Sequence, residues 1–275
     1  MNPLRQQRWF ASLVVTLIAV GVVSILWLDL WSRRRHLQNT STVTGWCLLV
    51  VILALAVFNT RKKLSILPLG RASWWLKAHV AGGFATLAVF WLHTGTLWPA
   101  GGYERVLAGL FYAVNVSGLV GLALQKLYPP ALTRSGVEVI FERIPEEVAS
   151  LREQAEGIVA ECTTVTASGV LAQLYLESLD WFFRRPRFAM SHAVGSETAR
   201  AWLRNECASI TRRLDAREQE YLRKVAALAE QKVNLDFHFV AQTITKCWLL
   251  AHVPLAAAMI ALALWHALVV YVYVL

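Results

Sequence analysis

The sequence has few cysteines and few charged residues for its length. Its four cysteines, among 275 residues, are widely separated and never form a Cys-x-x-Cys pair. A thiolate zinc site, a ferredoxin-type cluster and covalent c-type haem attachment therefore have no sequence support, and a secreted disulfide scaffold is disfavoured. Charged residues make up 16% of the chain, whereas soluble domains carry nearer to a quarter. An ordinary soluble enzyme is not expected.

Common nucleotide and hydrolase motifs are also missing from the most polar part of the chain. Residues 127–246 contain no Gly-x-Gly-x-x-Gly, no phosphate-binding loop ending in Gly-Lys-Ser/Thr and no Gly-x-Ser-x-Gly. Nucleotide, flavin and serine-hydrolase chemistry thus has no visible site there. The net charge of +9 does not indicate nucleic acid, because the basic residues flank apolar runs, as at membrane–water interfaces.

Long apolar runs dominate the rest of the sequence, in which 56% of residues are hydrophobic and the mean hydropathy is +0.46. A membrane-spanning helix needs about 20 mostly apolar residues. Five stretches qualify, at 9–31, 43–60, 74–97, 104–126 and 247–273. The first is too long for a signal-peptide core, so we interpret it as a retained helix. The sequence predicts an all-α integral membrane bundle of five transmembrane helices in contact with lipid.

The flanking charges predict an orientation in the inner, cytoplasmic membrane. Five spans place the two termini on opposite sides. The N-terminal arginines, the basic residues 61–63 and the segment 127–246 then share one side, which the excess of positive charge indicates to be cytoplasmic. The C-terminus lies outside. The cluster 33–35, Arg-Arg-Arg, falls on the outer side and opposes this assignment locally.

A helical domain is predicted between the fourth and fifth spans. Its boundaries divide the chain into spans one to four at 1–128, an extramembrane domain at 129–243 and the last span at 244–275. Tyr128-Pro129-Pro130 is expected to stop the fourth span. Two apolar seams follow at helical spacing: Ile144, Val148, Leu151, Ala155, Ile158, Cys162 and Val165, then Cys207, Leu214, Tyr221, Leu228 and Leu235. A small helical bundle or hairpin would pack them together.

Between the two seams, residues 181–188 read Trp-Phe-Phe-Arg-Arg-Pro-Arg-Phe. Alternating aromatic and basic side chains suit a membrane surface. A basic helix end packed on the bundle fits equally well.

Four of the seven histidines fall within two apolar spans, at the same spacing. His79 and His93 lie on the third span, and His252 and His266 lie on the fifth. Fourteen residues make just under four helical turns, so each pair shares a helix face and is separated by about 21 Å along the axis. The two spans cross in the same direction, which pairs His79 with His252 at one depth and His93 with His266 at the other.

This arrangement predicts two b-type haems, each with two axial histidines. Imidazole is a haem-iron ligand, and two axial histidines leave no open position for a substrate, which favours electron transfer over oxygen chemistry. The alternative is histidines that are hydrogen-bonded between helices, or another metal. Ionisable residues inside membranes are costly and usually functional, and matched spacing on two helices fits the structural alternative poorly.

Small and basic residues extend the candidate haem sites. Glycines lie near the histidines on the third and fourth spans, where a macrocycle or a neighbouring backbone could approach: Gly82, Gly83, Gly118 and Gly121. Lys77, Arg71 and Lys246 could meet haem propionates or act as interfacial anchors.

Three further polar residues are considered for a quinone pocket or a third haem. Tyr112 and Asn115 could line a quinone pocket, or bond a neighbouring helix. His238 lies fourteen residues before His252 but among charges, so an interfacial position is favoured over a third haem.

The histidine-bearing segments resemble the di-haem cytochrome b arrangement of respiratory membrane complexes. Residues 76–79 with 93–95, residues 117–125 and residues 248–254 look like a bacterial family of membrane di-haem cytochrome b-like proteins. The similarity covers less than half of the chain. The insertion of about 120 residues before the second histidine pair departs from the respiratory pattern. The partners and the quinone site of that family are therefore not carried over to this chain.

We therefore expect an electron-transfer subunit of an oxidoreductase complex rather than a self-contained enzyme. It would relay electrons across the membrane between a quinone pool and a partner subunit carrying c-type haems or iron–sulfur clusters. One alternative is a ferric-reductase-like transmembrane protein fed by a separate flavin subunit. The other is a haem-free membrane scaffold whose helical domain recruits partners.

Overall fold

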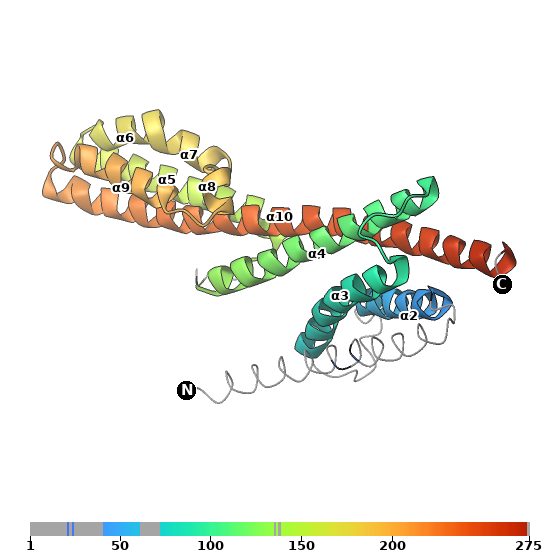
Figure 1. The fold of residues 1–275 in the computed structure, drawn as a ribbon. Helices are drawn as coiled ribbons and strands as arrows, with labels where there is room; N and C mark the ends of the chain where they lie inside the picture. Colours follow the sequence, from blue (N-terminus) through green and yellow to red (C-terminus); the bar gives the residue numbers. More distant parts are fainter. Residues whose placement is uncertain are drawn as a thin grey trace. The chain divides into compact units, whose positions relative to one another are not determined.

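The structure, a computed structural model, describes residues 41–60, 72–134, 136 and 139–273, together with residues 21 and 24. Every regular element in this part of the chain is a helix, and it contains no strand (Figure 1). The all-α prediction is confirmed for these residues. Apart from residues 21 and 24, the first predicted span at 9–31 lies outside the described residues.

The chain divides into two compact units. The first consists of Met1–Leu122 and Leu249–Leu275, and the second is Ala123–Trp248. Both divisions fall inside long helices, since α4 covers Gly102–Arg134 and α10 covers Ala216–Tyr273. The predicted boundaries after residues 128 and 243 also fall inside these two helices.

Three helices are long and apolar enough to cross a membrane: α3 (Ala72–Thr94), α4 and α10. Helices α4 and α10 contain the fourth and fifth predicted spans, and α3 covers the third except for its last three residues, 95–97. The second predicted span coincides with helix α2 (Ser41–Thr60), but its described apolar part, Ser41–Val57, is shorter than a full span. The structure therefore supports a helical membrane protein with three candidate spans among the described residues.

The core of the first unit joins side chains from all four of these helices. Leu48 and Ile52 come from α2, Phe90 from α3, Phe111 from α4 and Met259 from α10. The rings of Phe90 and Phe111 stack with their centroids 4.3 Å apart. Offset stacking is one of the arrangements that aromatic pairs prefer.

Helix α3 ends one residue after His93, and the sequence explains why. Gly95 adopts the left-handed conformation with φ +67°, and its amide donates to the carbonyl of Trp91 at 3.0 Å. Glycine takes this conformation without steric cost and so closes the last turn. The end of α3 is thereby fixed just beyond the histidine.

The prolines at 129 and 130 do not stop α4, contrary to the prediction, because the helix continues to Arg134. Proline removes one backbone donor and crowds the carbonyl four residues earlier. Here the affected turn lies at the exposed end of the helix, where water can satisfy the freed carbonyls. Two side chains also cap the final turn, since Thr133 donates to the carbonyl of Pro129 and Arg134 to that of Pro130.

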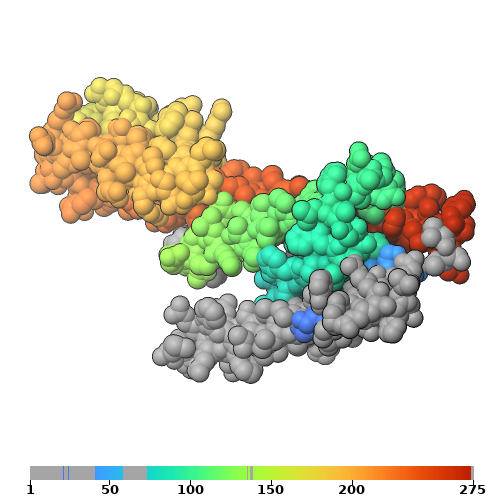
Figure 2. All heavy atoms as spheres, viewed as in Figure 1, coloured from blue at the N-terminus to red at the C-terminus, as the bar shows by residue number. Residues whose placement is uncertain are grey.

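The second unit is a helical domain built around the first half of α10 (Figures 1 and 2). Its shorter elements are η1 (Phe141–Arg143), α5 (Ile144–Thr166), α6 (Val170–Leu174), the π-helical turn η2 (Tyr175–Leu179), α7 (Asp180–Arg184), α8 (Ala189–Ala193) and α9 (Thr198–Thr211). Figure 2 shows the yellow and orange part of the chain as closely packed.

The first predicted seam is buried as expected along α5, except at two positions. Ile158 is only partly buried and Val165 is 53% exposed, while Val159 is buried instead. The second seam spans two helices, because Cys207 lies on α9 and Leu228 on α10. Both seams meet in one apolar core, so the prediction of a small helical bundle fits this unit.

The aromatic-basic segment 181–188 packs mainly on the bundle. Phe182 and Phe183 are fully buried in its core, and the guanidinium of Arg187 lies 3.9 Å from the ring centroid of the half-exposed Trp181. Most of the aromatic surface is thus used inside the domain, which favours the second of the two sequence interpretations.

A fully buried ion pair holds this segment to α10. The ammonium of Lys232 lies 2.5 Å from the carboxylate of Asp236, and both side chains are 0% exposed. Lys232 also donates to the carbonyl of Arg185, and Asp236 accepts from the amide of Arg187. Each buried charge thus has a main-chain partner besides the ion pair, while Oδ1 of Asp236 has no hydrogen-bond partner among the described residues.

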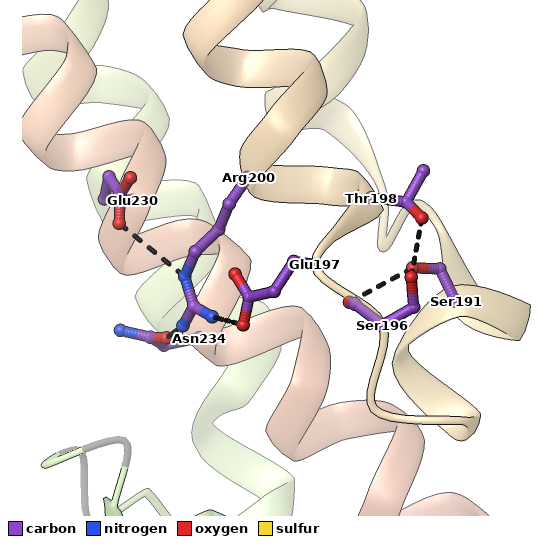
Figure 3. Close-up of polar contacts among 7 residues, drawn as sticks. All are labelled: Ser191, Ser196, Glu197, Thr198, Arg200, Glu230 and Asn234. Atoms are coloured by element: carbon purple, nitrogen blue, oxygen red, sulfur yellow. Dashed lines mark hydrogen bonds and ion pairs between the residues drawn. The ribbon is translucent and has the colours of Figure 1, made fainter.

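Polar contacts also join α9 to α10 (Figure 3). The guanidinium of Arg200 donates to Glu197 at 2.8 Å and to the side chain of Asn234 at 2.7 Å, and it lies 3.8 Å from Glu230. The turn before α9 is closed by a bond from the hydroxyl of Ser191 to the carbonyl of Ser196.

Candidate functional site

His93 lies in the last turn of α3, beside the first turn of α2. Its Nδ1 is 3.0 Å from the carbonyl oxygen of Ser41 and 3.2 Å from the hydroxyl of Thr44. A carbonyl only accepts hydrogen bonds, so this nitrogen carries the proton and donates. The other ring nitrogen, Nε2, is then unprotonated, and its lone pair can bind a metal ion.

His266 of α10 faces the His93 ring. The two ring centroids are 6.4 Å apart with an interplanar angle of 84°. Two imidazoles that bind one metal ion from opposite sides need about this separation, because each metal–nitrogen bond is about 2 Å and each ring adds about 1 Å to its centroid. The separation also suits a simple edge-to-face ring contact.

Tyr103 at the start of α4 supports His266 from the other side. Its ring stacks on the imidazole with centroids 6.0 Å apart, and its hydroxyl donates to the carbonyl of Leu262 at 2.7 Å. These contacts join the ends of α4 and α10 at the level of the histidine.

A cavity of about 400 Å³ opens beside the two rings. Helices α2, α3, α4 and α10 all contribute to its wall, which includes Gly45, His93, Phe111, Met259 and His266. Most of the lining is apolar, and its polar groups include the two imidazoles, the carboxylate of Glu104 and the hydroxyls of Ser41 and Thr94. An apolar cavity with a few polar groups is the usual character of a cofactor site.

His79 and His252 form the second pair, further along the same two helices. Nδ1 of His252 lies 3.1 Å from the hydroxyl of Ser117 on α4, and His252 and His79 are close enough to interact electrostatically. His79 also interacts with the main chain of Leu55 on α2. The structure thus brings His93 and His266 together, and it places His79 and His252 on the same two helices, α3 and α10, of the first unit.

Each histidine pair supplies only two ligands. Among the described residues there is no group of three or more His, Cys, Asp or Glu side chains that could hold a metal ion. A bare metal would therefore be under-coordinated at either pair, whereas a haem brings four nitrogens of its own and needs two axial ligands. The donor set fits a haem better than an isolated ion.

The predicted glycines have different surroundings. Gly118 adjoins the site, since a side chain there would contact Cε1 of His252 at 4.0 Å. Gly82 faces Leu55 and so serves packing between α3 and α2, while Gly83 has open space around it. Gly121 is buried on α4.

The basic residues proposed for propionates have protein partners where the structure describes them, and their role toward a haem stays a prediction. The ammonium of Lys77 lies 5.9 Å from the ring centroid of Trp74 on its own helix. Lys246 pairs with Glu142 at 2.9 Å and lies over the ring of Phe141 in the second unit. Arg71 falls outside the described residues.

The remaining polar candidates also find structural partners. The hydroxyl of Tyr112 donates to the carbonyl of Leu97 and accepts from the indole of Trp91. Asn115 donates to its own helix at the carbonyl of Phe111. His238 is buried in the second unit, rather than interfacial, and burial lowers its pKa.

Sequence reasoning missed the contribution of α2. Ser41, Thr44 and Gly45 all lie against His93, although α2 carries no histidine. The only available signal was spacing, because Ser41 and Leu55 are fourteen residues apart, as are His79 and His93.

A comparison of the chain with protein-family models, with curated proteins and with solved structures found no match.

Proposed function

We propose that the chain is a membrane cytochrome subunit that carries electrons across the bilayer through two bis-histidine b-type haems. The observation that carries this proposal is the opposed pair His93 and His266, with centroids 6.4 Å apart and Nδ1 of His93 already bound to a carbonyl. His79 and His252 provide a second pair about 21 Å away along the same helices.

The protein's part in this function is to hold and surround the cofactors. The four histidines would be axial ligands, and the apolar side chains of the first unit would exclude water from them. A bound haem supplies reversible one-electron chemistry, while ligation and dielectric are set by the protein. Because both axial positions are filled, the chain would act as a relay within a redox complex, between a quinone pool and a partner with c-type haems or iron–sulfur clusters.

Haem content tests the proposal directly. The purified full-length chain should yield two acid–acetone-extractable b-type haems, and its paramagnetic resonance spectrum should show low-spin ferric iron. A chain without haem would instead be the scaffold alternative. A mainly high-spin, five-coordinate spectrum would also reject the proposal, since it requires an open axial position.

Histidine substitutions test the pairing. His93→Ala and His266→Ala should remove the same component from a redox titration, and His79→Ala and His252→Ala should remove the other. His192→Gln, in the second unit, is the matched control and should retain both components. Loss of one component by His79→Ala and His266→Ala together would show that the pairs are assigned wrongly.

A further inference from the structure

Helix α2 has no histidine, yet it lies alongside the part of α3 that carries His79 and His93. Ser41 lies beside His93 and Leu55 beside His79. Ser41 and Leu55 are fourteen residues apart on α2, as His79 and His93 are on α3. Because the first of the α2 residues lies beside the second of the α3 histidines, the two helices run antiparallel. Of the two α3 histidines, His93 makes a hydrogen bond to the main chain of α2.

The contact with His93 is built from three neighbouring residues. The carbonyl of Ser41 accepts from Nδ1, and the hydroxyl of Thr44, which itself donates to that carbonyl at 3.0 Å, lies 3.2 Å from the same nitrogen. Thr44 is only 2% exposed, so its hydroxyl approaches the bond from the buried side. The tautomer and the rotation of the ring are both constrained.

Gly45 completes this arrangement by leaving room for the ring. A Cβ atom at this position would lie 2.9 Å from Cε1 of His93, closer than a carbon–carbon contact allows. Any larger residue would push the imidazole away from the Ser41 carbonyl. The glycine is thus a steric requirement of the histidine's position.

We propose that α2 is the positioning helix of the His93/His266 haem site, with Ser41, Thr44 and Gly45 orienting His93. This inference rests on the proposed function. A hydrogen bond from Nδ1–H to a carbonyl raises the basicity of the liganding nitrogen and fixes its direction. The more basic ligand favours ferric iron and so lowers the reduction potential of the His93 centre.

Gly45→Ala is the sharpest test, because it changes one methyl group and displaces one ring. We expect the His93/His266 centre to lose roughly 10- to 100-fold in haem affinity, the usual effect of removing an outer-shell partner. Its reduction potential should rise and its low-spin g values should shift, while the other centre stays unchanged. Haem transfer to apomyoglobin, redox titration and paramagnetic resonance measure these three quantities.

Gly157→Ala is the matched control, since it lies on α5 in the second unit and the added methyl meets no atom within 4 Å. It should leave both centres as in the wild type. Thr44→Val provides a second variant that keeps the shape of the side chain and removes its hydroxyl, and it should shift the same component as Gly45→Ala by a smaller amount.

Two outcomes separate this inference from the proposed function. If the wild type binds two low-spin haems but Gly45→Ala and Thr44→Val leave both centres unchanged, α2 does not position His93 and only the inference fails. Nitrogen-15 spectra of histidine-labelled apoprotein, assigned with His93→Gln, test the bond without haem. They should show the Nδ1–H tautomer for His93, and the Nε2–H tautomer would overturn the inference.

Discussion

His192 is predicted to make the stability of the helical domain depend on pH. Its side chain is 4% exposed, and Nε2 has no hydrogen-bond partner among the described residues. Burial lowers its pKa to about 4, with further lowering by the positive charges of Lys232 and Arg200 and a partial offset by Glu197. The folded domain therefore holds this imidazole neutral, whereas the unfolded chain protonates it near pH 6.5.

The sign follows from proton binding. A group with a lowered folded pKa stabilises the fold above its unfolded pKa, and that stability is lost as the pH falls. When the pH falls from about 8 to about 5, His192 should lower the free energy of unfolding by roughly 2 kcal/mol. Asp236 opposes it, because burial raises its pKa to about 6, and its protonation in the folded state should return about 1 kcal/mol over that range.

On this acidification the wild type should therefore lose about 2 kcal/mol more unfolding free energy than His192→Gln, because His192 is the one titrating group that differs between them. Urea unfolding of the full chain in detergent, followed by circular dichroism, measures the difference. All other titrating groups are shared by the two proteins, so the change in slope belongs to His192. Equal pH dependence in both proteins would refute the buried, neutral imidazole.

Two further predictions address the ion pair and the topology. Lys232→Met should destabilise the helical domain by about 3–5 kcal/mol because it leaves Asp236 buried without its partner, whereas Lys232→Met with Asp236→Leu should be close to wild type in the same urea assay. If the double variant lost as much unfolding free energy as Lys232→Met, the ion pair itself would be stabilising. An alkaline phosphatase fusion after Leu275 should be active and one at Ser196 inactive; the reverse activities would invert the membrane orientation.

Periodic features could be predicted from the sequence because helical geometry converts spacing into position. The fourteen-residue spacing of His79 and His93 places both on one face whatever surrounds them. The apolar seam of α5 was predicted for the same reason, and Ile144, Val148 and Leu151 are buried. The haem ligation itself stays a prediction, because the spacing gives the ligands' positions but not their occupant.

Contacts made by the main chain could not be predicted from the sequence. Every residue has a carbonyl, so residue type does not distinguish Ser41 as the partner of His93. The burial of His238 was also hidden, because its charged neighbours suggested an interfacial position. Lys232 and Asp236 are themselves buried, and a one-dimensional pattern cannot show that two charges neutralise each other inside a core.

The matched fourteen-residue intervals on α2 and α3 also limit how these helices can change length during evolution. One inserted residue between His79 and His93 would rotate one histidine by about 100° relative to the other, and one inserted between Ser41 and Leu55 would do the same to the main-chain partners. A tolerated insertion in one helix would need a compensating insertion in the other. Among homologues we expect length variation to be concentrated in the helical domain and nearly absent from these two intervals.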